Sequence, residues 1–149
     1  MVQENILPYF MPENKEKLGE LLAMLQVSHA LLPLTEGLSA TAFHLSRIIS
    51  IVTDCVACGY IPEEQANSLL DQYGTLATTL FTNWQAFLAS AILGKQWMSW
   101  AHGQFIVDAK DYTNACLELA AHPMKPLELS GLWVGSNTQA LLNCFSYHS

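Results

Sequence analysis

Cys55 and Cys58 form a Cys-x-x-Cys pattern, the spacing used by redox-active thiol pairs. A redox pair places its first thiol at a helix N-terminus, where the helix dipole stabilises the thiolate. Here the predicted helix ends at about Cys58, before Gly59, so the dipole has the opposite sign at the pair. No βαβ pattern surrounds it, as a thioredoxin-like unit would require. We therefore interpret both cysteines as small buried or half-buried thiols without redox function.

The other residues that could bind a metal ion are scattered along the chain. A zinc site needs a second pair of ligands, and Cys116, Cys144 and the five histidines show no metal-ligand spacing. The sequence contains no nucleophile elbow, phosphate-binding loop or dinucleotide fingerprint. Residues 131–136 include two glycines but lack the lysine of a phosphate loop. The sequence thus predicts no catalytic residue, no metal and no cofactor, and leaves open an enzyme whose site is assembled from distant residues.

Two charged residues occur in a predicted helix that is otherwise mainly apolar. Arg47 lies in this helix, and Asp54 follows it two turns later. Such an arginine can contact a ligand or a partner, or it can pair with a carboxylate or with capping carbonyls of a neighbouring helix. We favour the structural role, and we keep Arg47 and Asp54 as candidate binding residues.

Trp97, Met98 and Trp100 could line a pocket for a hydrophobic ligand. Aromatic residues at helical spacing more often belong to the protein core. We expect that role here, and we keep Trp97 and Trp100 as candidate binding residues.

Helical periodicity extends over most of the chain. We expect residues 1–11 to form an irregular N-terminal arm and residues 12–149 to form a single helical domain. Prolines followed by glutamates predict helix starts at Pro12 and Pro62. Ser39 or a neighbour is expected to cap the helix that ends at Cys58. The pattern predicts an all-α bundle of five to seven helices.

A buried central helix is predicted at about residues 83–102. Thr82 and Gln85 have the spacing of a capping box at its start. Apolar residues occupy two of its faces, which is typical of a helix packed on both sides. Gly94 costs about 1 kcal/mol in a helix interior, so we expect a neighbouring helix to cross close to it.

Glycine and proline divide the other predicted helices. Gly74 is expected to interrupt the helix that starts at Pro62. A further helix is predicted over residues 105–121, and a last one from Pro126 towards Phe145, with a kink or turn near Gly135.

The composition excludes several classes of protein. The chain has 149 residues, of which 51% are hydrophobic and 13% charged, so it is not disordered. Its net charge of −7 disfavours nucleic-acid binding and suits a basic protein partner. The uncharged stretch of residues 72–94 contains too many polar groups for a membrane span. The N-terminus has no signal-peptide pattern, so we expect a cytoplasmic protein with reduced thiols and no membrane span.

Several short motifs follow one another between residues 47 and 97. They are an arginine-bearing helix that ends in Gly59-Tyr60-Ile61, then Glu63-Glu64 and Ala66, then Trp84-x-x-Phe87, and finally Gly94 and Trp97. In these motifs the chain resembles a bacterial family catalogued as domain of unknown function twelve-sixty-six. The resemblance implies a helical bacterial domain without an established activity.

A second resemblance concerns the C-terminal half. Its alanine- and leucine-rich helices, followed by Pro123 and Pro126-Leu127-Glu128-Leu129, are similar to phasins, which coat polyester storage granules.

These observations favour a non-enzymatic bacterial interaction protein. The leading hypothesis is an immunity- or antitoxin-type binder of a basic effector protein. The alternative is a phasin-like carrier or coat protein that binds lipid or polymer through an apolar groove, and the second alternative is the enzyme with a dispersed site. The low charge content also allows an apolar patch for self-association into a homo-oligomer.

Overall fold

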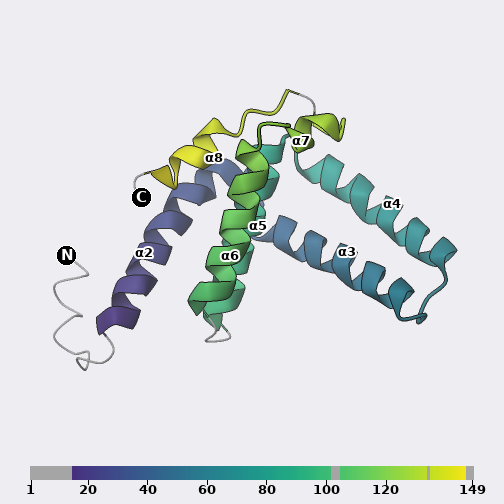
Figure 1. Ribbon diagram of the computed structural model, residues 1–149, viewed down its shortest axis with the longest axis horizontal. Helices are drawn as coiled ribbons and strands as arrows, with labels where there is room; N and C mark the ends of the chain where they lie inside the picture. The colour runs from purple at the N-terminus through teal and green to yellow at the C-terminus, as the bar shows by residue number, and fades with distance from the viewer. Residues whose placement is uncertain (1–14, 102–104, 134, 147–149) are drawn as a thin grey trace.

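The computed structural model describes residues 15–101, 105–133 and 135–146, and the side chains of these ranges except those of residues 15–17 and 105–108 (Figure 1). All regular elements in these ranges are helical. They are α2 (Lys15–Leu31), the 3-10 helix η3 (Leu32–Thr35), α3 (Thr41–Ala57), α4 (Glu63–Leu80), α5 (Trp84–Ala101), α6 (Phe105–Ala121), α7 (Pro126–Leu129) and α8 (Gln139–Asn143). The predicted all-α class is confirmed, with five long and two short α-helices. The predicted arm of residues 1–11 lies outside the described residues.

The helix α5 is the centre of the bundle. It contacts α2, η3, α3, α6 and α8, and Ile92 and Leu93 at its middle are fully buried. This confirms the central helix predicted at residues 83–102. Figure 1 shows α3 and α4 running side by side away from the other helices, and we call this pair the α3–α4 hairpin (residues 41–80).

The two long helices α3 and α5 cross closest at Gly94. A Cβ atom built at Gly94 would collide with Cβ of Phe43 and would lie 3.0 Å from Phe43 Cγ and 3.1 Å from the Ala40 carbonyl oxygen. Only a residue without a side chain fits there, which confirms the close helix crossing predicted at this glycine.

The N-terminus of α3 is capped from another helix. No local side chain caps it, so the expectation for Ser39 was wrong. The backbone N–H of Ala42 instead donates to Oγ of Ser90 on α5, at 2.9 Å, and both residues are fully buried. The close crossing at Gly94, one turn further along α5, brings this hydroxyl within reach of the α3 backbone.

The start of α5 also differs from the prediction. Asn83 is its cap, because its Oδ1 accepts the backbone N–H of Ala86 at 2.8 Å. The hydroxyl of Thr82, the predicted cap, donates to Oε1 of Glu36 at the end of η3. Asn83 Nδ2 donates to the same carboxylate oxygen at 3.0 Å. Asparagine is as good a cap as threonine, and the carboxylate draws the threonine away.

Gly74 does not interrupt α4, which is continuous from Glu63 to Leu80. A helix-interior glycine destabilises by only about 1 kcal/mol, and packing of α4 against α3 outweighs that loss. The next turn adds local bonds, since Thr78 Oγ1 donates to the carbonyl oxygens of Gly74 and Thr75.

Trp97 and Trp100 are not core residues, contrary to the prediction. Their side chains are 44% and 52% exposed, while Gln96 and Ser99 occupy the buried face of the same turns. The buried Ser28 Oγ donates to Gln96 Oε1 at 3.1 Å, so a hydrogen bond between α2 and α5 selects the polar face for the interior.

Among the described residues, Leu18–Thr35 has the length and mean hydropathy, 1.3, of a membrane span, and 22% of it is buried. The pair α4 and α5 passes the same test as a unit, but it is bent by 107°. Buried core helices and N-terminal signal sequences satisfy these criteria as well, and Leu18–Thr35 lies near the N-terminus.

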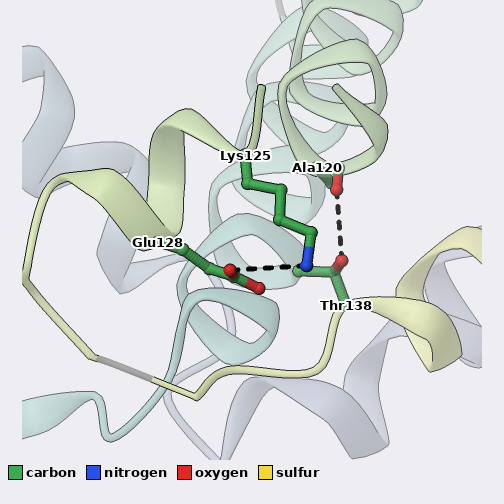
Figure 2. Close-up of polar contacts among 4 residues, drawn as sticks. All are labelled: Ala120, Lys125, Glu128 and Thr138. Atoms are coloured by element: carbon green, nitrogen blue, oxygen red, sulfur yellow. Dashed lines mark hydrogen bonds and ion pairs between the residues drawn. The ribbon is translucent and has the colours of Figure 1, made fainter. Parts of the chain in front are cut away.

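The C-terminal segment is not the single helix that was predicted. Residues after α7 turn at Gly131 and Gly135, whose φ angles of 71° and 80° are left-handed, and α8 follows. Figure 2 shows how this segment returns to α6, with Thr138 Oγ1 donating to the Ala120 carbonyl at 3.3 Å. The nearby ion pair of Lys125 and Glu128, at 3.5 Å, is largely exposed.

A pair of glycine substitutions tests the helix crossing. Gly94→Ala should destabilise the protein by about 1–3 kcal/mol, because the new methyl group overpacks the contact with Phe43. Gly74→Ala, where nothing lies within 4 Å of the Cβ position, should stabilise it by about 0.5–1 kcal/mol through helix propensity. Urea unfolding of both variants measures this, and equal changes in free energy would contradict the crossing.

The cap supplied by Ser90 has its own test. Ser90→Ala should destabilise by about 1–3 kcal/mol, because the buried N–H of Ala42 loses its acceptor. Thr53→Ala is the control, since its hydroxyl bonds to the Ile49 carbonyl on the exposed side of α3, and it should change stability by less than about 0.5 kcal/mol. Hydrogen exchange of the Ala42 amide should accelerate in the first variant alone.

Candidate functional site

The described side chains contain no cluster of metal-binding residues. No group of three or more His, Cys, Asp and Glu residues in the described ranges could hold a metal ion. The candidate functional site is instead a groove of about 440 Å³ between α4 and the N-terminal end of α5. This volume is in the range of small-ligand pockets.

One side of the groove is formed by α4. Asp71, Gly74, Thr75 and Thr78 lie at successive helical positions along it. Gly74 leaves the middle of this side without a side chain, and a Cβ atom there would meet open space. The described structure therefore has room at this glycine for a group from another molecule.

Aromatic rings form the opposite side. Trp84 and Trp133 meet edge to face with their ring centroids 4.7 Å apart, and Phe87 lies 5.8 Å from Trp84 and 5.5 Å from Trp133. Phe87 also packs edge to face against the fully buried Phe81 at 5.3 Å. These contacts connect the wall of the groove to the protein core.

Two hydrogen bonds hold Trp84 in place. Trp84 Nε1 donates to the Leu127 carbonyl at 3.0 Å, and the Trp84 backbone N–H donates to Ser136 Oγ at 3.0 Å. Trp133 has a left-handed φ of 39°, a conformation that strains a residue with a side chain. Its carbonyl accepts hydrogen bonds from the hydroxyl and the backbone N–H of Ser136, at 2.8 and 3.3 Å, and its ring packs on Trp84 and Phe87. The C-terminal segment thus completes a site that begins on α4.

Asp71 is the only charged residue among the described residues that line the groove. Asp71 is exposed. The other acids of α4, Glu63 and Glu64, lie in the first turn of that helix. An apolar surface with one carboxylate at its edge can bind a molecule that combines an apolar body with a cation. Aromatic rings add a further attraction for a cation.

Arg47 and Asp54 lie on α3 and are both exposed. The Arg47 guanidinium lies over the Phe43 ring, with its carbon 6.0 Å from the ring centroid. Among the described residues no carboxylate forms an ion pair with Arg47, and the contact described for its guanidinium is the Phe43 ring on its own helix. The carboxylate or carbonyl partner favoured for Arg47 stays a prediction.

The four residues proposed from the sequence do not form one site. Trp97 and Trp100 lie in the last turns of α5, and no described ring or polar contact joins them to Arg47 or Asp54. The groove itself was missed. Two of its aromatic residues, Trp84 and Phe87, belong to a motif that carried the family resemblance. That motif was the signal that could have located the groove.

The thiols differ in their environments. Cys55 and Cys58 are free and lie at the C-terminal end of α3, as the sequence predicted. Cys55 is half-buried as expected, but Cys58 is exposed, so the prediction of a buried or half-buried thiol was wrong there, because Cys58 follows the last helical residue. On α6, burial raises the pKa of the Cys116 thiol to about 11. Burial also raises the pKa of Cys144. A raised pKa keeps a thiol protonated and unreactive.

Alkylation should follow this order of environments. In native protein near pH 8 we expect iodoacetamide to modify the exposed Cys58 fastest and Cys116 slowest, because a pKa of about 11 in place of 9.0 leaves about 100-fold less thiolate. Mass spectrometry of timed digests measures the rates. Urea-unfolded protein is the control, and all four cysteines should react alike in it. Equal rates for Cys58 and Cys116 in the folded protein would refute this assignment.

Comparison with known proteins gives one match. The family described as "Protein of unknown function (DUF1266)" matches residues 3–133, a longer stretch than the motifs of residues 47–97. No curated protein and no solved structure matches the chain. The match spans the long helices and both walls of the groove, up to Trp133. The chain therefore belongs to the DUF1266 family.

Proposed function

We propose that this domain acts by stoichiometric binding of a basic protein partner and not by catalysis. The observation that supports this is the charge of the α3–α4 hairpin. Four carboxylates on it are exposed, and its one formal cation, Arg47, is exposed as well; the carboxylates are Asp54, Glu63, Glu64 and Asp71. Such an excess of negative charge on a projecting element (Figure 1) attracts a basic surface.

Apolar groups on the same hairpin supply the contact that charge alone lacks. Ile51 is 54% exposed, Tyr60 80% and Leu76 41%. Large apolar residues that are exposed in the free protein become buried in a complex and carry most of the binding energy. The surrounding charges set the association rate. The hairpin thus combines long-range attraction with short-range apolar contact.

The finer proposal concerns the identity of the partner. A small acidic domain that binds a basic effector protein fits an immunity or antitoxin role, and the net charge of −7 supports a basic partner. The partner's gene is then expected beside that of the domain.

A lipid- or polymer-binding carrier is the second candidate, and two surface features favour it. Leu18–Thr35 is apolar and 22% buried. Trp97 and Trp100 are also exposed on α5. Exposed tryptophan and leucine side chains are typical of proteins that lie on a lipid surface.

Binding kinetics test the leading proposal. The domain purified from its native host should carry a basic protein in near-equal amount. Association of the purified pair should slow as salt rises, while dissociation changes little. Removing three hairpin charges should slow association roughly tenfold at low salt; the substitutions are Asp54→Asn, Glu63→Gln and Glu64→Gln.

The control variant removes an equal number of negative charges, three, from α2 and α6, where the acids are also exposed. Its substitutions are Glu20→Gln, Asp111→Asn and Glu118→Gln. Equal slowing by both triple variants would show that net charge acts and the hairpin does not. A salt-independent association rate would contradict the proposal. Lipid in place of a protein partner, with co-sedimentation on anionic vesicles, would favour the carrier.

A further inference from the structure

The groove beside α4 has features that specify what part of a partner it would receive. Three half-buried rings, those of Trp84, Phe87 and Trp133, border it on one side. The side of α4 opposite them is bare at Gly74. Rings that border a groove with open space at a helix glycine leave room for one apolar side chain from another molecule, as in an anchor pocket of a protein interface.

The polar groups of the groove restrict the anchor's neighbour. Thr78 already uses its hydroxyl on the backbone of its own helix. Asp71 is one turn from Gly74 along α4 and makes no ion pair with any described cation. Its carboxylate is therefore available to a cation that lies next to the apolar side chain. An anionic neighbour would be repelled by it.

Resting on the proposed function, we infer that the groove binds a short segment of the basic partner in which an apolar or aromatic side chain lies beside a lysine or arginine. The apolar side chain packs between Gly74 and the rings, and the cation pairs with Asp71. Charge complementarity between Asp71 and a basic peptide favours this occupant. A peptide with this pattern is a defined ligand class for which the groove is selective.

Selection from a library of random dodecapeptides displayed on phage tests the inference with the whole domain as bait. The enriched peptides should share an apolar or aromatic residue beside a lysine or arginine. A synthetic peptide of that pattern should bind Gly74→Leu more than about tenfold more weakly, because the leucine fills the anchor position. It should bind Asp71→Asn roughly two- to fivefold more weakly.

Each variant has a matched control elsewhere in the chain. Gly19→Leu makes the same change inside α2, at another helical glycine with nothing within 4 Å of its Cβ position. Asp111→Asn removes the same charge from the exposed face of α6. Both controls should bind the peptide as the unchanged domain does. Thermal unfolding checks that all four variants are folded.

A charge reversal keeps the inference testable if Gly74→Leu does not fold. Asp71→Lys should reject the basic peptide and accept its variant in which the cation is replaced by glutamate. Failure of the library to enrich any pattern, enriched peptides without a basic residue, or binding unaffected by Gly74→Leu and Asp71→Lys would each overturn the inference. Loss of the peptide by Gly74→Leu with unchanged binding of the natural partner would overturn the groove's role and leave the proposed function standing. If a peptide binds in the groove but the domain has no natural protein partner, the groove's peptide selectivity stands and the proposed function is overturned.

Discussion

The contact on which the structure depends most is the close approach of α3 and α5 at Gly94. Because this residue lacks a side chain, the Phe43 ring and the Ala40 carbonyl can lie directly against the α5 backbone. The same approach lets Ser90 reach the N–H of Ala42 and cap α3. The direction of α3 then fixes α4, which packs along it, and so fixes one side of the groove. A single missing side chain thus determines both the core and the position of the candidate site.

Most of the helices could be predicted from the sequence, because apolar periodicity and proline starts are local signals. Several of the errors concern interactions between distant segments. Ser39 was expected to cap α3, but the hydroxyl that does so lies on α5. Thr82 had the spacing of a cap, but Glu36, 46 residues away, bonds its hydroxyl. Gly74 was expected to break a helix that packing on α3 keeps intact. The local sequence allowed each predicted cap and helix break, but contacts between distant segments determined the structure that forms.

The candidate site was harder to predict than the fold for the same reason. Trp84 and Phe87 are neighbours on one helix and formed a recognisable motif, but Trp133 joins them from a glycine-containing segment that was predicted to be helical. Asp71 and Gly74 line the groove together with those rings only because α4 is continuous. Trp97 and Trp100 illustrate the converse case, since a hydrogen bond between Ser28 and Gln96 turns the polar face of that turn inward. Periodicity cannot reveal such a choice.

The hairpin leaves the body of the protein and returns to it at neighbouring points. Glu36 bonds to Thr82 and Asn83, and Ala42 bonds to Ser90, so the chain ends of this excursion are fastened together twice. Closing a longer loop costs only about 0.6 kcal/mol for each doubling of its length. The outer part of the hairpin can therefore lengthen or shorten during evolution while the crossing of α3 and α5 keeps its packing. In such an architecture the part that meets a partner can diverge quickly, and the part that folds can stay the same.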